Sequence, residues 1–211
     1  MDLSEAIARP IPHYDGKRSF LERLKRRQRD LDRLKLETQA VVRALPQYEF
    51  RECEFESQAE HLKSFIGTAE LIPVPVRGPK GSMVVIVAPT RVWHDAKIRE
   101  RLWRLRRSSL VDGVPTVRLL TQRWIRRKPF LENCELIARC AQLSVSARDR
   151  FSVQLLVREN PLATLEDCAA VVQATDAFGV VFALVSSGLL TIDFEAAITP
   201  MSPVEECKRE R

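Results

Sequence analysis

Residues 83–90, MVVIVAPT, constrain the fold more than any other stretch of the 211-residue chain. Their short apolar run is typical of a buried β-strand. A very basic segment follows at once, and its Ile98, Leu102 and Leu105 recur at the spacing of an amphipathic helix. Residues 113–121, GVPTVRLLT, then predict a turn and a second strand. Strand, helix and strand in this order predict a right-handed crossover between adjacent parallel strands, so we expect an α/β sheet flanked by helices.

The segment before this unit predicts one more helix and one more strand. Leu62 and Phe65 have the spacing that would form the inner face of a short helix. Residues 70–76, ELIPVPV, are expected to be extended, and their alternating prolines restrict them to an edge of the sheet. Both elements therefore belong to the same α/β unit.

The last third of the chain has a different pattern, with three short helices followed by a strand. Thr164 and Asp167 match a capping box, Asp176 is an expected N-cap, and Gly188 an expected helix stop. Three helices and then a strand or ribbon are the order of a winged-helix domain. The third helix, however, carries no Lys or Arg. A helix that reads DNA needs cations or amides, so this helix is expected to pack or to contact a protein.

The net charge of +6 is concentrated in two blocks. Residues 17–43 carry ten Lys or Arg against four acids, and residues 91–128 carry twelve against three. Such blocks predict an electrostatic footprint for nucleic acid. The candidate DNA contacts are Arg23, Lys25, Arg26, Arg27, Arg91, Lys97, Arg99, Arg101, Arg104, Arg106, Arg107, Arg123, Arg126, Arg127 and Lys128.

The first basic block predicts a helix with one apolar edge, formed by Phe20, Leu24, Leu31 and Leu34. Three interpretations stay open for it: a solvated helix that packs on its own domain, an arm that contacts DNA, or a short coiled-coil contact.

The second basic block contains all three tryptophans, Trp93, Trp103 and Trp124. Aromatic rings among arginines can stack on bases. A Trp at helical spacing is more often part of the core, and we expect that role for Trp103.

Other features limit the compartment and exclude several site types. The five cysteines form no C-x-x-C pair, which suits a reducing compartment, and the three histidines are too far apart in sequence for a structural zinc site. The N-terminus lacks the apolar core of a signal peptide, and residues 177–192 are too short and interrupted for a membrane helix. We therefore expect a soluble, cytoplasmic protein with no contact to a membrane.

Three segments resemble a known family: ESQAEHLKSFI, VPTVRLLTQRWIRRKPFLENCELIARC and FALVSSGLLTIDFEAAITPMSPV. From about residue 48 to residue 204 the chain is similar to the TnsA-like endonuclease subunits of heteromeric transposases. The resemblance implies a restriction-endonuclease-like core, a mixed sheet flanked by helices, and a winged-helix-like tail. The domains expected are residues 1–46, the N-terminal segment and basic helix, residues 47–143, the nuclease-like core, and residues 144–211, the winged-helix-like domain.

The resemblance fails at the residues that would hold a metal. Such nucleases place a Glu on the first helix, an Asp in a turn, and a Glu or Gln two residues before a Lys on the central strand. Carboxylates are required because Mg²⁺ prefers hard oxygen ligands. Here Glu60 matches the first position, the turn in VPVRGPKGSM has no acid, and the strand positions are Ile86 and Ala88. We predict no catalytic residue, no metal and no cofactor, with Glu60 a vestigial candidate or a capping residue.

Relocated ligands are the alternative to a lost site. Asp95 and Lys97 have a D-x-K spacing, but Asp95 is expected to favour the start of the basic helix and Lys97 to be solvated. Glu52, Glu54 and Glu56 alternate as on a strand and would supply one further ligand.

Three functions follow from these patterns. The leading hypothesis is a DNA-binding protein with a TnsA-like fold and no nuclease activity, acting structurally or in regulation in transposition, recombination or transcription. The alternatives are an active Mg²⁺-dependent endonuclease subunit with relocated ligands, and a non-enzymatic module for protein interaction. DNA is the expected partner, with a transposase, a recombinase or another protein at the C-terminal domain, or a second copy of the chain, as further options.

Overall fold

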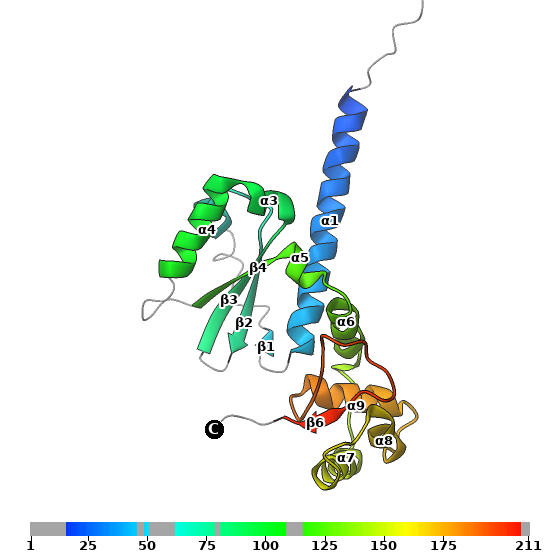
Figure 1. Cartoon of the computed structure of the whole chain (residues 1–211). Helices are drawn as coiled ribbons and strands as arrows, with labels where there is room; N and C mark the ends of the chain where they lie inside the picture. The colour runs from blue at the N-terminus through cyan, green and yellow to red at the C-terminus, as the bar shows by residue number, and fades with distance from the viewer. Residues whose placement is uncertain (1–15, 46–48, 51–61, 79–80, 109–115, 208–211) are drawn as a thin grey trace, which may run out of the picture.

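The computed structural model describes residues 16–45, 49–50, 62–78, 81–108 and 116–207. Within these ranges the protein is a mixed α/β structure (Figure 1). The helices are a short one over residues 62–66, α1 (Gly16–Ala44), α3 (Thr90–His94), α4 (Ala96–Ser108), α5 (Gln122–Ile125), α6 (Phe130–Cys140), α7 (Ala147–Glu159), α8 (Leu165–Ala170) and α9 (Ala177–Ser186). The strands are β1 (Glu49–Phe50), β2 (Ile72–Gly78), β3 (Gly81–Ala88), β4 (Thr116–Thr121), β5 (Leu190–Ile192) and β6 (Val204–Glu206).

The main sheet has the order β1-β2-β3-β4. Strands β2 and β3 form an antiparallel hairpin in which Gly78 faces Gly81. Strands β3 and β4 are parallel, in a register that pairs Met83 with Thr116. The predicted unit of strand, helix and parallel strand is therefore confirmed.

Strand β3 is buried on both faces, which explains its unbroken apolar sequence. Side chains alternate along a strand, so Val85 and Val87 point into one core, which contains α1 and α6, while Val84 and Ile86 point into another. That second core contains α4 and the 62–66 helix. The sheet thus lies between α1 on one side and α3 and α4 on the other (Figure 1).

Two predictions around β2 were wrong. Its prolines were expected to restrict it to an edge of the sheet, but β2 lies between β1 and β3. Within the described ranges β1 pairs with Val76 and Arg77, so the prolines, which have no N–H to donate, lie before these pairs and face β3. Phe65 was wrongly predicted to face inward. It is 59% exposed, and Ile66 is fully buried instead, because the helix turns the neighbouring residue toward the sheet.

The basic segment after β3 is two helices, not the single one predicted. Asp95 ends α3 in an extended conformation. Its Oδ1 then accepts hydrogen bonds from the backbone N–H groups of Lys97, at 2.9 Å, and Ile98, at 3.2 Å. A carboxylate at this point satisfies free donors at the start of α4. The expected role of Asp95 at a helix start is therefore confirmed.

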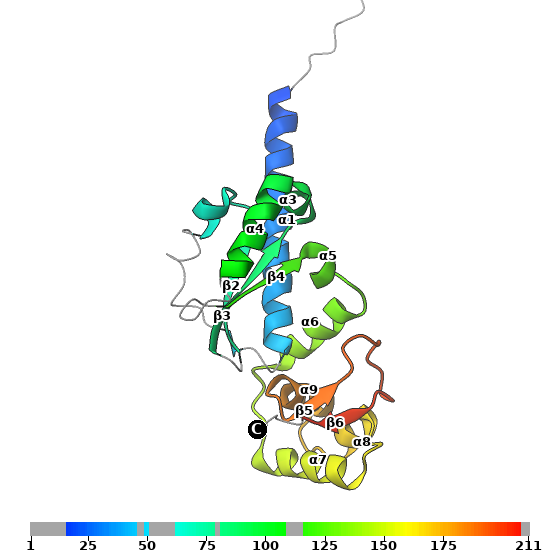
Figure 2. The ribbon, with the colours of Figure 1, turned by 60° about the vertical axis from the view of Figure 1, so that its left-hand side comes forward.

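Helix α1 is packed over only part of its length. In its C-terminal half Leu34 and Val41 are buried against the sheet and α6. In its N-terminal half Phe20 and Leu24 are 55% and 43% exposed, and this half extends beyond the rest of the protein in both views (Figures 1 and 2). The interpretation of α1 as a helix that packs on its own domain therefore fits its C-terminal half and does not explain its N-terminal half.

The C-terminal part contains the predicted three helices and a ribbon, formed by the antiparallel strands β5 and β6. The capping box of Thr164 and Asp167, the N-cap Asp176 and the helix stop at Gly188, whose φ is 72°, are all confirmed. Residues 179–185 of α9 are buried, so this helix packs inside the protein as expected. No described helix is both long and apolar enough to span a membrane.

One apolar core connects these parts. It runs from Leu34 of α1 through Val85 of β3 and Ile137 of α6 to Leu184 of α9 and Val204 of β6. The predicted domain boundaries after residues 46 and 143 stay predictions. Helix α6 contacts both α1 and α9 and joins the sheet to the C-terminal helices.

Candidate nucleic-acid interface

Helix α4 has one buried side and one strongly cationic side. Leu102 is fully buried, and Ile98 and Leu105 pack beside it in the core under the sheet. The other positions of the helix point to solvent, because 3.6 residues per turn separate them from this stripe. The exposed cations are Lys97, Arg99, Arg101, Arg104, Arg106 and Arg107.

Few acids offset this charge. Glu100 is the acid within α4, and its carboxylate accepts a hydrogen bond of 2.6 Å from Arg104. Both side chains of that pair are more than half exposed, so the pair adds little stability. Arg101 donates to the backbone carbonyl of Ile66 at 3.0 Å and so connects α4 to the 62–66 helix. The α4 surface, defined as the exposed face from Lys97 to Arg107, therefore keeps a clear positive excess.

The tryptophans have different environments. Trp103 is 40% exposed, so the prediction that it belongs to the core was wrong. The reason is angular: it follows Leu102, the innermost residue of α4, by about 100° around the helix axis. Its ring meets Trp93 edge-on at 6.1 Å, and the Arg106 guanidinium lies 5.2 Å from its centre. Trp124 instead packs against Phe130 in the other core.

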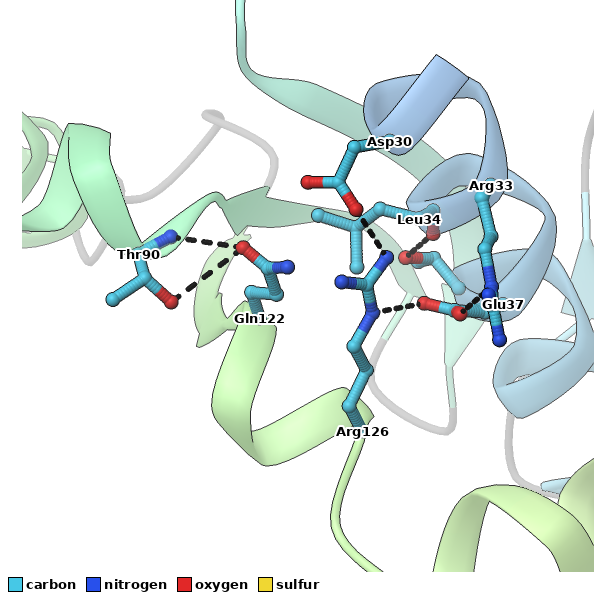
Figure 3. A network of polar contacts seen from close by, with 8 residues as sticks. Asp30, Arg33, Leu34, Glu37, Thr90, Gln122 and Arg126 are labelled. Atoms are coloured by element: carbon cyan, nitrogen blue, oxygen red, sulfur yellow. Dashed lines mark hydrogen bonds and ion pairs between the residues drawn. The ribbon is translucent and has the colours of Figure 1, made fainter. Parts of the chain in front are cut away.

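The turn after β4 holds Arg126 inward (Figure 3). Thr121 caps α5 by accepting the N–H of Trp124 at 3.1 Å, and Ile125 is fully buried. Arg126 Nε then donates to Glu37 of α1 at 2.6 Å, and its Nη2 lies 3.0 Å from Asp30. Burial lowers the pKa of Arg126, but the hydrogen bond to Glu37 and the ion pair with Asp30 more than offset this effect and raise it overall.

Arg127 is also committed to internal contacts. Its guanidinium lies 3.9 Å from the centre of the Trp124 ring and 3.6 Å from that of Phe130. It also forms an ion pair with Glu195, and this hydrogen bond lowers the pKa of that carboxyl. Cation–π contacts of this kind stabilise the guanidinium in its position over the rings. Arg126 and Arg127 therefore hold the fold together in this structure.

The remaining predicted contacts of the second block lie around the same turn. Arg123 is exposed. Lys128 is also exposed and pairs with Glu132 at 2.5 Å, which raises the pKa of the lysine. Arg91 is half-buried and donates to Glu70 at 2.6 Å. Gln122 accepts the N–H of Thr90 at 3.1 Å, so the starts of α3 and α5 are joined (Figure 3).

The four predicted contacts in the first block, Arg23, Lys25, Arg26 and Arg27, are exposed on the projecting half of α1. Because α1 and α4 cover opposite faces of the sheet, the cations of α1 and those of α4 form two surfaces (Figure 1). The structure therefore brings the α4 cations together and keeps the α1 cations apart from them.

The residues that the resemblance would align with a metal site are apolar, engaged elsewhere or outside the described ranges. Ile86 and Ala88 are each 1% exposed and belong to the core beneath α4. The carboxylate of Asp95 is engaged as the cap of α4. Glu60 lies outside the described residues, as do Glu52, Glu54 and Glu56. Within the described ranges no three metal-ligating side chains come together.

Two cysteines are buried, and burial makes their thiols weakly acidic. Burial raises the pKa of Cys134 to about 12 and that of Cys168 to about 11. Both are fully buried, and a thiolate is the reactive form of cysteine.

No protein-family model, no curated protein and no solved structure matches the chain. The geometry of its own residues therefore carries the functional argument.

Sequence reasoning missed two residues of this region. Glu37 was counted only as an acid in a basic block, although it is 4% exposed and binds Arg126, 89 positions away. Its one sequence signal is its position between the apolar residues Leu34 and Val41. The sequence indicates the exposure of Trp103 only through its position next to Leu102.

Proposed function

We propose that this protein binds DNA without cleaving it and acts as a structural or regulatory component in DNA transactions such as transposition, recombination or transcription. The α4 surface supplies the main contact, and the projecting half of α1 supplies a second cationic one.

The α4 surface is the observation that carries this proposal. Its cations lie along about three turns of one helix, and its apolar side anchors that helix to the sheet. Phosphates of DNA attract such an array, and counterion release makes the binding strongly dependent on salt. A helix that is only solvated does not require so large an excess of positive charge. Within α4, Glu100 is the single acid that opposes these cations.

The absence of cleavage is the second part of the proposal. We take the α/β core as a restriction-endonuclease-like fold in which Ile86 and Ala88 replace the residues that handle metal and proton. Neither side chain offers an oxygen ligand, and both are buried. A core that keeps its shape but lacks this chemistry still positions α4 for binding.

Gel-shift or anisotropy titrations of a short DNA duplex test this function. We expect the triple variant Arg99→Gln, Arg106→Gln and Arg107→Gln to bind at least ~10-fold more weakly at moderate salt. The slope of log affinity against log salt should fall by roughly 2 to 3, because each lost phosphate contact contributes about 0.9. Gln keeps the helix propensity of Arg, so α4 should stay folded.

The matched control replaces Arg139, Arg148 and Arg150 with Gln. These arginines are exposed on α6 and α7, away from the α4 surface, and the change in net charge is the same. An equal loss of affinity in this control would contradict the assignment to α4. Cutting of supercoiled plasmid with Mg²⁺ that disappears in Glu60→Ala would contradict the absence of cleavage.

A protein-interaction module is the second candidate, favoured by exposed apolar side chains on α7 and in the segment after it. Phe151 and Leu155 of α7 are 67% and 41% exposed, and Leu162 beyond the helix is 84% exposed. Clustered exposed apolar residues often mark contacts with other proteins. A wild-type protein that binds no DNA even at low salt would favour this candidate over the first.

A further inference from the structure

Trp103 is an exposed aromatic ring in the middle of the α4 surface. Exposure of 40% is a cost for a ring of this size, since burial of apolar area is the main source of stability. Among the described residues its aromatic contact is with Trp93, and the Arg106 guanidinium also lies near the ring, so part of the indole stays exposed to solvent.

The surroundings of the ring form a shallow hollow that is largely open to solvent. The hollow has a volume of about 490 Å³ and is lined by Ala96, Arg99, Glu100, Trp103 and Arg107. These positions share one face of α4, because residues three and four apart on a helix are neighbours. Ala96 leaves room at one end, and arginines lie one turn before and one turn after the tryptophan.

The charges in the hollow favour an anionic aromatic ligand. Glu100 is its one acid, and Arg104 already binds that carboxylate at 2.6 Å. Arg106 lies over the Trp103 ring at 5.2 Å and adds a third cation beside it. A flat apolar ring among guanidinium groups is the combination that binds a nucleobase together with its phosphates.

We propose that Trp103 is a stacking platform for unpaired bases, so that the α4 surface binds single-stranded DNA in addition to duplex. This inference rests on the proposed function and specifies its ligand. In a duplex the bases are stacked on each other, and a surface helix reaches only phosphates and groove edges. An unpaired base can leave its neighbours and stack on the indole, and the flanking arginines hold the adjacent phosphates.

The platform is tested by measuring two affinities at the same salt concentration. One ligand is a labelled oligothymidylate of about 20 nucleotides, and the other is a duplex of the same length. We expect Trp103→Leu to weaken single-strand binding by about 5- to 100-fold, the range of a lost base stack. Its duplex affinity should change less than about twofold, since the phosphate contacts stay. Trp103→Phe should keep most of the single-strand affinity, because it retains a π face.

Leu keeps apolar bulk against Trp93, so this variant should stay folded, and Phe151→Ala serves as a control for the loss of an exposed aromatic elsewhere. Unchanged single-strand binding in Trp103→Leu, or equal losses for both DNA forms, would overturn the platform. Wild-type binding to duplex but not to single strand would overturn it while leaving the proposed function intact. Binding to neither form would remove the proposed function itself, and the platform with it.

Discussion

At the scale of single residues, Glu37 shows how one carboxylate can hold two parts of the chain together. It is 4% exposed and binds two arginines, Arg33 one turn before it at 2.9 Å and Arg126 of the α5 turn at 2.6 Å. The two partners differ in environment, since Arg33 is 77% exposed and Arg126 is 28% exposed. A buried charge needs its partner far more than an exposed one does.

We expect Arg126→Met to lower the free energy of unfolding by about 2 kcal/mol, less than the roughly 3–5 kcal/mol of a fully buried pair. Arg126 is partly exposed, and Arg33 continues to compensate Glu37. Arg33→Met, which removes the other partner of the same carboxylate, should cost less than ~0.5 kcal/mol. Urea denaturation compares the two, and equal costs would contradict a structural role for Arg126.

Asp149 is a second buried carboxylate with a specific role. It is 5% exposed, accepts the backbone N–H of Gln173 at 2.8 Å and accepts the hydroxyl of Ser146 at 2.8 Å. The backbone hydrogen bond from Gln173, and then that from Ser146, lower the pKa of Asp149. The carboxylate therefore joins the start of α7 to the segment after α8 in its ionised form.

The lowered pKa gives a pH dependence of stability. Stability from the ionised form is present above the unfolded pKa of about 4 and is lost as pH falls toward the lower folded value. We expect Asp149→Asn to be less stable than the wild type at pH near 7, and its stability to fall less between about pH 4 and pH 2. Urea midpoints across this range measure the effect. Glu159→Gln at the exposed end of α7 is the control, and a wild-type curve parallel to that of Asp149→Asn would contradict the assignment.

At the scale of elements, the sequence predicted those features of helices and strands that depend on neighbouring residues. The apolar run of β3 and the cap residues Thr164 and Asp176 were sufficient because each acts on its own strand or helix start. The two environments of α1 could not be predicted. Phe20 and Leu34 belong to one stripe of one sequence pattern, but only Leu34 meets the sheet. The ion pair of Arg126 joins residues far apart in sequence, for which no spacing rule exists.

The candidate interface was predictable in the same limited sense. The excess of cations in α4 followed from counting, and their common face from helical periodicity. The inward position of Arg126 and Arg127 depended on Glu37, Trp124 and Glu195, which approach only in the folded chain.

The division of α1 gives a prediction for a helix breaker. We expect Lys25→Pro, in the exposed half, to change the free energy of unfolding by less than ~0.5 kcal/mol, because the exposed turns before it can unfold locally without uncovering packed side chains. Ala40→Pro, in the packed half, should cost more than ~3 kcal/mol, through a lost backbone hydrogen bond and a steric clash. Urea midpoints test both, and a similar loss in the two variants would show that the projecting half is packed.

At the scale of the whole molecule, the continuous core predicts how the protein unfolds. Cys134 of α6 and Cys168 of α8 are fully buried in the same cluster as Leu34 and Val85. The described structure thus contains no gap in apolar packing between the sheet and the C-terminal helices. Parts that share one core unfold together, whereas parts joined by a small polar interface unfold separately.

We therefore expect one cooperative transition in urea, and the chain supplies its own probes for it. All three tryptophans precede residue 125 and report on the α/β part by fluorescence, whereas the reaction of Cys168 with a thiol reagent, located by mass spectrometry, reports on the C-terminal helices. The two midpoints should coincide, and so should that of Cys134, which lies in the helix between the two parts. Labelling of Cys168 at lower urea than the change in fluorescence would show a C-terminal domain that unfolds independently. In that case the contact of α6 with α9 would be a docking interface, and the boundary near residue 143 would separate two folding units.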